Sequence, residues 1–233
     1  MKKLAIFVEG QAEQIFVRTL LKEIAGKNNI AVEDKSLSGK LGNRITTLRM
    51  SDNITFQTKF YVLVYNSCSD NSVVSDMRDQ YISLIGSGFE RVIGLRDVYP
   101  TPIAEKLKLQ SGLNYFLPKG TIPIHIVLAV MEIESWFLSE WNHFMKIDLS
   151  LTPEKIKATF GFNPQTDDME TRPHPANDMD LIYKLVGRAY KKQKNQVNTI
   201  VLSLDYEFLY IQLVNSVPSL GEFVRYLDLF LIP

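Results

Sequence analysis

Acidic side chains stand at the ends of apolar runs in this chain. Glu9 and Glu132 directly follow such runs, and Asp97 lies at the end of another. In parallel α/β sheets, functional groups gather beyond the carboxyl ends of the strands. Carboxylate oxygens are hard ligands that suit Mg²⁺ or Mn²⁺ rather than zinc. The pattern therefore predicts a divalent-cation site built from these acids.

Two further acids lie close to these three in the sequence. Glu13 stands four residues after Glu9, about one helical turn along if a helix starts near residue 11. Glu134 follows Glu132 by two residues and would point elsewhere on a helix, so we expect at most one of that pair to contact a metal. A structural alternative stays open, in which Glu9 caps the helix and Glu13 is solvated.

Basic residues cluster late in the chain without an acid among them. The segment between Leu181 and Leu204 carries five: Lys184, Arg188, Lys191, Lys192 and Lys194. They form either a solvated helix face or a surface for a phosphodiester backbone. Lys40 and Arg44 stand in another polar, basic segment, which we expect to be a loop or helix start over 35–49.

The elements that must position these residues alternate between strand and helix. Apolar runs predict strands over 4–8, 60–65, 91–95 and 122–131. Helical periodicity predicts helices over 15–24, 72–85, 132–140, 181–192 and one or two over 197–230. Alternation of this kind is typical of an α/β fold with a mainly parallel sheet flanked by helices. We expect a core over 1–140 and a mostly helical extension over 141–233.

Composition excludes several classes of protein. The 233 residues include 26 Lys and Arg against 26 Asp and Glu, and 45% are apolar. Such a chain is neither disordered nor a polycationic nucleic-acid coat. The single cysteine, Cys68, excludes an internal disulfide and Cys-cluster metal sites. The apolar start ends at Glu9, too soon for a signal peptide, so we expect a cytoplasmic protein without membrane spans.

The motifs resemble a known family. The opening Phe7-Val8-Glu9-Gly10-x-x-Glu13, the segment Asp97-Val98-Tyr99, the segment Met131-Glu132-x-Glu134-x-Trp136-Phe137 and Tyr190-x-Lys192 together cover most of the chain. They resemble a Toprim-like group of bacterial proteins of unassigned function, which is related to the Toprim domain of OLD-family nucleases. The resemblance implies a Toprim-like, Rossmann-like sheet.

It also implies a metal-dependent nuclease. Carried over to this sequence, Glu9, Glu13, Asp97 and Glu132 would hold the metals, and Lys192 would assist catalysis. Tyr99 occupies the place of the second Asp in the family's Asp-x-Asp pattern, so a two-metal site lacks a ligand unless Glu134 substitutes. The resemblance further implies an ABC-type ATPase partner and a role in antiphage defence.

The sequence thus yields a main hypothesis and two rivals. The main one is hydrolysis of DNA or RNA with Mg²⁺ or Mn²⁺, in which Glu9, Asp97, Glu132 and Lys192 are catalytic. The nucleic-acid backbone would contact basic residues, namely Lys40, Arg44, Arg188, Lys191 and Lys194. The rivals are a catalytically degenerate Toprim scaffold that binds the ATPase, and an enzyme for nucleotides or other small phosphate esters. Association of copies of the chain is compatible with each hypothesis.

Overall fold

A six-stranded sheet forms the first part of the fold. The computed structural model describes residues 1–40 and 42–232. The strands are β1 Lys2–Val8, β2 Ile30–Ser38, β3 Ile45–Ser51, β4 Phe60–Asn66, β5 Arg91–Asp97 and β6 Ile124–Ala129. Their order is β3-β2-β4-β1-β5-β6, and β3 is antiparallel to β2 whereas β1, β2, β4 and β5 pair in parallel. The predicted α/β class, with its mainly parallel sheet, flanking helices and helical C-terminal region, is confirmed.

Strand β1 lies in the interior of the sheet, between β4 and β5. Its last residue, Val8, is in register with Asn66 of β4 and Leu95 of β5. Residues 4–8 are buried, which is the burial expected for a continuous apolar run covered on both faces. Glu9 therefore follows the strand at its carboxyl end.

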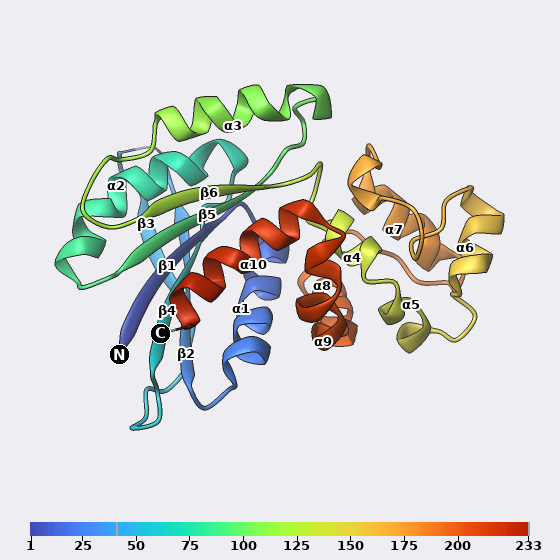
Figure 1. The fold of residues 1–233 in the computed structure, drawn as a ribbon, viewed down its shortest axis with the longest axis horizontal. Helices are drawn as coiled ribbons and strands as arrows, with labels where there is room; N and C mark the ends of the chain where they lie inside the picture. The colour runs from blue at the N-terminus through green and yellow to red at the C-terminus, as the bar shows by residue number, and fades with distance from the viewer. Residues whose placement is uncertain (41, 233) are drawn as a thin grey trace. The chain divides into compact units, whose positions relative to one another are not determined.

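Helices cover both faces of this sheet (Figure 1). On one face α1, Gln11–Ala25, contacts β1, β2 and β4. On the other face lie α2, Val73–Gly86, and α3, Lys106–Tyr115, and Phe7 of β1 packs there with Met77 of α2. Alternation of side chains along each strand supplies an apolar set to each helical layer.

The loop or helix start predicted over 35–49 is wrong at both ends, where β2 and β3 stand; of the residues between them, 39, 40 and 42–44 are a connection, and residue 41 lies outside the described residues. Polar residues interrupt the apolar pattern of β2, which hides the strand from a pattern search. Asp34, for example, accepts a hydrogen bond from Nη1 of Arg18 at 3.0 Å. All residues of β3 are exposed at the edge of the sheet.

The chain divides into two compact units. Unit 1 contains residues 1–96, 104–128 and 225–233, and unit 2 contains residues 97–103 and 129–224. Residues 129–140, which we assigned to the core from the sequence, belong to unit 2, and residues 225–233 belong to unit 1. Glu9 and Glu13 are thus in unit 1, whereas Asp97 and the later site residues are in unit 2.

Unit 2 is largely helical. Its α-helices are α4 Glu134–Ser139, α5 Asn142–Ile147, α6 Pro153–Phe160, α7 Pro175–Lys184, α8 Lys194–Ser203, α9 Tyr206–Ile211 and the first half of α10 Pro218–Leu231. The remaining residues of α10 belong to unit 1. No helix among the described residues has the length and apolarity needed to cross a bilayer.

The predicted helix over 181–192 is wrong beyond its first turn, because α7 ends at Lys184. The amide of Arg188 donates back to the carbonyl of Tyr183 at 3.0 Å, and Gly187 adopts a φ of 69°. A left-handed glycine shortly after the last turn is a common way to end a helix. Residues 185–193 therefore form a connection, which we call the lysine loop.

Trp136 is the largest fully buried side chain in unit 2. Its indole Nε1 donates to the hydroxyl of Ser219 at 2.7 Å, and that hydroxyl donates to the carboxylate of Glu170. The backbone amide of Ser219 also donates to Glu170, at 3.1 Å. This chain of bonds ties α4 to the start of α10 and satisfies polar groups that burial would otherwise penalise.

Gly221 of α10 leaves no room for a side chain, because a Cβ there would collide with the backbone carbonyl of Val214. We expect Gly221→Ala to lower the free energy of unfolding by about 1–3 kcal/mol, since backbone must move to admit the methyl group. The matched control is Gly112→Ala in α3, where a Cβ meets open space. That variant should gain about 0.5–1 kcal/mol from helix propensity. Urea denaturation measures both, and equal effects would contradict the close approach.

Candidate acid–lysine site

Three side chains that are distant in the sequence meet in unit 2. Nζ of Lys192 lies 3.1 Å from Oε1 of Glu132 and 3.0 Å from Oε2 of Glu134. The Glu134 side chain is 0% exposed and that of Glu132 is 13% exposed, whereas Lys192 is 39% exposed. The ammonium group therefore joins a buried carboxylate to one that borders solvent.

The other oxygens of both carboxylates also have donors. The hydroxyl of Tyr190 donates to Oε1 of Glu134 at 2.6 Å. The backbone amide of Ala176, in the first turn of α7, donates to Oε2 of Glu132 at 3.0 Å. Every carboxylate oxygen of the pair thus faces a donor or a cation, as burial of charge requires. The arrangement holds both acids and the ammonium group in fixed positions.

Asp180 of α7 anchors the lysine loop. Its Oδ1 accepts from the backbone amide of Tyr190 at 2.9 Å. Its Oδ2 lies 2.6 Å from Nζ of Lys191 and 2.7 Å from Nζ of Lys184. Hydrogen bonds from Lys184 and Lys191 hold the pKa of Asp180 well below its usual range. Asp180 therefore holds the lysine loop in position where the loop approaches Glu134.

Strained backbone accompanies this cluster. Among residues 1–40 and 42–232, the non-glycine residues with positive φ are Cys68, Met131 and Lys192, at 57°, 58° and 52°. Met131 directly precedes Glu132, and Lys192 carries the ammonium group. Side chains disfavour this region of φ, and such strain concentrates at functional sites. One of the three strained residues thus belongs to the acid–lysine cluster, and a second directly precedes it in the sequence.

Asp97 adjoins the same segment. It is 5% exposed, and its Oδ1 accepts from the backbone amide of Ile133 at 2.9 Å. Asp97 is therefore fixed against the residue that separates the two glutamates. Tyr99 stands where the resemblance expects a second Asp. Its ring centroid lies 5.8 Å from that of His174, and the two rings are nearly perpendicular. The structure thus brings Asp97, Glu132, Glu134 and Lys192 into one unit.

The two early acids lie in unit 1. Glu9 is half-buried after β1, and α1 begins at Gln11 as expected. Glu13 is 4% exposed in the first turn of α1, where the helix dipole favours a negative charge. Its Oε2 lies 3.0 Å from the position of a Cβ on Gly10, so glycine leaves space for that carboxylate. The solvated alternative for Glu13 does not agree with this burial.

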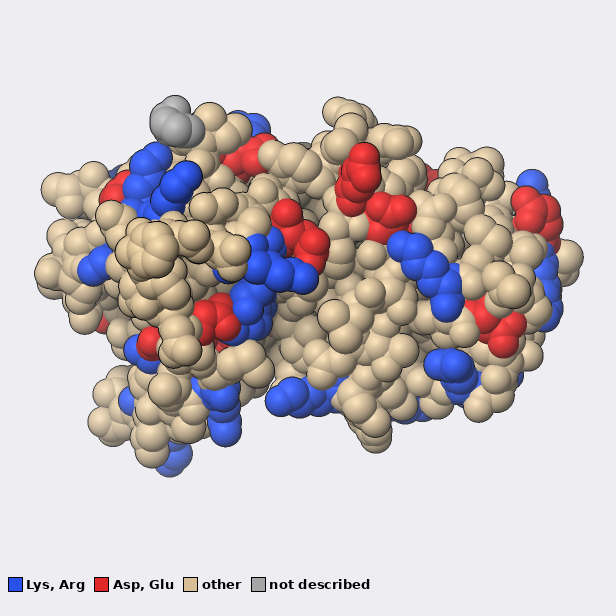
Figure 2. Space-filling model, turned by 90° about the horizontal axis from the view of Figure 1, so that it is seen from below, with Lys and Arg blue, Asp and Glu red and all other residues tan. Residues whose placement is uncertain are grey.

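The predicted backbone-contact residues have different surroundings. Arg44 donates to the buried carboxylate of Asp76 and to the carbonyl of Ser67, so it has a structural role in unit 1. Lys191 is paired with Asp180. The other three are exposed: Lys40, Arg188 and Lys194. On the face shown in Figure 2, blue and red surfaces adjoin in several places and neither colour forms a continuous field.

The donors at this site match the chemistry of a hard cation. Carboxylate oxygens of Asp97, Glu132 and Glu134 are the ligands that Mg²⁺ and Mn²⁺ prefer. The ammonium group of Lys192 lies between two of them, Glu132 and Glu134. Among the described residues, no three side chains of His, Cys, Asp or Glu are arranged as a metal-binding group. The donor types fit a metal, and Lys192 is the cation paired with them.

Sequence reasoning did not anticipate Asp180 or the amide of Ala176. Asp180 resembles any acid on a helix surface, and a backbone amide leaves no mark in the sequence. Tyr190 entered only through the resemblance and not through its own spacing. Its buried bond to Glu134 depends on the path of the lysine loop, which a helical prediction over 181–192 had excluded.

Comparison with known proteins yields one family. A family model described as "Domain of unknown function (DUF4276)" matches residues 8–227. No curated protein and no solved structure matches the chain. The matched range includes all the acids and the lysine of the site.

Removal of the Tyr190 hydroxyl should destabilise the protein. Tyr190→Phe leaves one oxygen of the buried Glu134 without its donor, which we expect to lower the free energy of unfolding by about 1.5–3 kcal/mol. Tyr115→Phe is the control, because Tyr115 is 81% exposed, and it should change little. Urea denaturation of both variants measures the difference. Equal stability of Tyr190→Phe and the wild type would contradict the bond to Glu134.

The contribution of Asp180 should depend on pH. Because its pKa is lower in the folded than in the unfolded state, Asp180 stabilises the fold above about pH 4 and loses that effect as the pH falls. The difference in unfolding free energy between wild type and Asp180→Asn should therefore shrink from pH 6 to pH 3. Asp79→Asn, at an exposed position, should show a small difference throughout. A difference in unfolding free energy between wild type and Asp180→Asn that grows toward low pH would contradict the pairing of Asp180 with Lys184 and Lys191.

Proposed function

The chain belongs to the family described as "Domain of unknown function (DUF4276)", and we propose that it is a metal-dependent nuclease. The proposed reaction is hydrolysis of phosphodiester bonds of DNA or RNA with Mg²⁺ or Mn²⁺. One observation carries the proposal: Lys192 lies against Glu132 and Glu134, 60 and 58 residues away in the sequence. Lys192 and Glu132, two of the residues that the Toprim resemblance nominates, are therefore neighbours in space.

The acids would hold the metal. Asp97 and Glu132 are the first candidates, Glu134 is buried behind Glu132, and Glu9 and Glu13 remain candidates from the sequence. A bound divalent cation would lower the pKa of a water molecule and neutralise charge on phosphate oxygens. The backbone amides of Ile133 and Ala176 orient Asp97 and Glu132, so each carboxylate is positioned before substrate arrives.

Lys192 would act on the phosphate. Its ammonium group can donate to a phosphate oxygen or to the leaving oxygen, which stabilises charge that develops in the transition state. Glu134 and Tyr190 keep the lysine and its loop in place, and the partial exposure of Lys192 gives a substrate access to Nζ. Glu134 would thus be a positioning residue, with its charge shielded from solvent.

The proposal includes the biological setting that the resemblance implies. We propose that the nuclease acts with an ABC-type ATPase in bacterial antiphage defence. Activity that appears only when the ATPase is added would fit this setting.

A catalytically degenerate scaffold is the second candidate. Two observations favour it, namely Tyr99 in place of an Asp and the lack of a three-residue metal-binding group among the described residues. A scaffold and a nuclease differ in metal binding. Titration with Mn²⁺ by calorimetry should show binding at millimolar concentrations or tighter for the nuclease, and none for the scaffold.

The central test is cleavage by conservative variants. Asp97→Asn and Glu132→Gln keep an oxygen that can accept from Ile133 or Ala176, so both should fold. Each should reduce Mn²⁺-dependent cleavage of DNA or RNA by about 100-fold or more. Glu154→Gln, at an exposed position of α6, is the control and should cleave normally. Undiminished cleavage by folded Asp97→Asn and Glu132→Gln would refute the assignment.

A further inference from the structure

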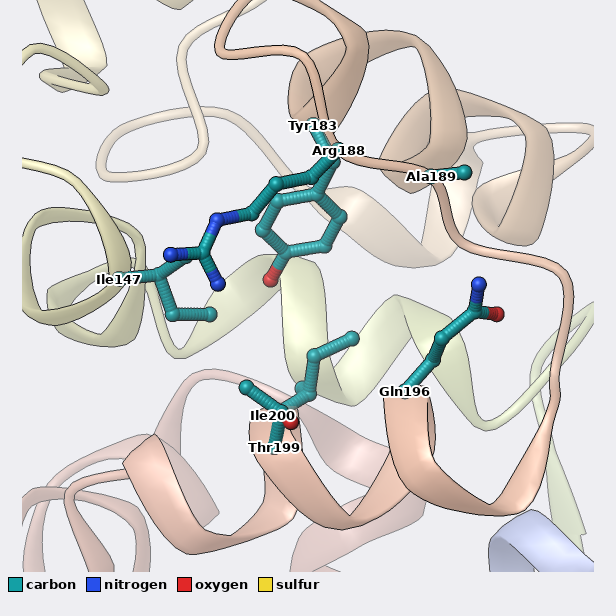
Figure 3. Close-up of a pocket in the computed structure, with 7 residues that line it drawn as sticks. All are labelled: Ile147, Tyr183, Arg188, Ala189, Gln196, Thr199 and Ile200. Carbon is teal, nitrogen blue, oxygen red and sulfur yellow. The ribbon is translucent and has the colours of Figure 1, made fainter.

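Unit 2 contains a pocket outside the acid–lysine site. Its volume is about 270 Å³, near the lower end for small-molecule sites. It lies between α5, the lysine loop and α8, and the side chains that line it include Ile147, Tyr183, Arg188, Gln196, Thr199 and Ile200. Figure 3 shows the Arg188 guanidinium on the side of Ile147 and the Gln196 amide on the opposite side of the pocket.

Arg188 gives the pocket a positive charge. It is exposed, and Asp148 interacts with it electrostatically, but within the part of the chain that the structure describes no acid forms an ion pair with it. A guanidinium group binds phosphate or carboxylate through two parallel hydrogen bonds. The pocket is therefore suited to a ligand that carries an anionic group at its mouth.

The polar groups opposite Arg188 have defined roles. Oε1 of Gln196 accepts from the backbone amide of Lys191 at 2.7 Å, so its NH₂ group is left to donate to a ligand. The hydroxyl of Thr199 donates to the carbonyl of Asn195 at 3.0 Å, so its oxygen can still accept. The pocket thus offers one donor and one acceptor to the edge of a ligand.

Buried neighbours fix Tyr183 in the pocket wall. Nδ1 of His143 contacts the carbonyl of Glu140, which can only accept, so Nδ1 carries a hydrogen. In neutral His143, Nε2 then accepts from the Tyr183 hydroxyl at 2.8 Å. Burial raises the pKa of Tyr183 well above its usual value, and the phenol stays protonated. Tyr183 therefore forms a fixed, largely buried part of the pocket wall and supplies no nucleophile.

The combination points to one class of ligand. Ile147, Ile200 and the largely buried Tyr183 give the pocket an apolar wall, which suits the ring of a ligand better than a charged group. The amide donor and hydroxyl acceptor suit the edge of a nucleobase, and Arg188 suits a phosphate. We propose that this pocket binds a nucleoside monophosphate, either as a free molecule or as the end of a nucleic-acid strand.

The pocket shares the lysine loop with the acid–lysine site. Arg188 precedes Lys192 by four residues, so their Cα atoms lie within about 14 Å of each other. Lys191, beside Lys192, bonds to Gln196 of the pocket. A bound nucleotide would therefore restrain the loop that presents Lys192. The binding proposal does not depend on the proposed nuclease activity.

Calorimetry in the presence of EDTA tests the proposal without any cleavage. AMP, GMP, CMP and UMP are titrated into the full-length protein, with inorganic phosphate in parallel. At least one nucleotide should bind more tightly than phosphate. Arg188→Ala should weaken that binding by about tenfold or more, because a charge-assisted bond is lost. Lys157→Ala removes an exposed charge from α6 and should bind as the wild type does.

A second measurement locates the ligand and identifies its source. Methyl resonances of Ile147 and Ile200 should shift on nucleotide binding in NMR spectra. A 5′-phosphorylated single-stranded hexanucleotide should shift them too if the site takes a strand end, and should not if it takes free nucleotides. Either pattern supports the site. Absence of binding at millimolar concentration, equal binding of phosphate and nucleotides, or unchanged binding by Arg188→Ala would overturn it.

Discussion

The burial of the Glu134 carboxylate is the constraint on which unit 2 depends. A charge without exposure must be compensated by partners, or it destabilises the fold strongly. Lys192 and the Tyr190 hydroxyl supply that compensation, and both come from the lysine loop. The loop must therefore leave the helical path after α7 and return toward α4. Asp180 bonds to the backbone of the lysine loop, so the position of Lys192 is set by several independent bonds.

The same rule operates in unit 1, where buried acids are paired with bases far away in the sequence. Asp76 pairs with Arg44, and Asp34 pairs with Arg18. For Asp34, burial outweighs the attraction of Arg18 and raises its pKa to about 6. The equal totals of acids and bases in the chain thus partly reflect internal pairing. Net charge alone says little about which charges remain available to a ligand.

Sequence reasoning recovered the parts of the fold that depend on local patterns. Continuous apolar runs predicted β1, β4, β5 and β6, and helical periodicity predicted α1 and α2. It missed β2 because polar residues interrupt its apolar pattern. It missed β3 because all residues of that strand are exposed and no apolar run marks it. The proximity of Lys192 to Glu132 depends on the path of the lysine loop. Because the two residues are 60 positions apart, their sequence spacing does not predict that they meet. Only the resemblance to a family linked those two residues.

The left-handed backbone at Lys192 sets conformational strain against ion pairing at a single position. Glycine adopts such a φ freely, whereas a residue with a side chain pays about 1–2 kcal/mol. Glycine at position 192 would relieve that strain, but it would leave the buried Glu134 carboxylate without its ammonium partner, which costs about 3–5 kcal/mol. The strain at Lys192 is thus offset by the ion pairs that its own side chain forms. Evolutionary persistence of lysine against its own backbone preference would be a signature of selection for its ammonium group.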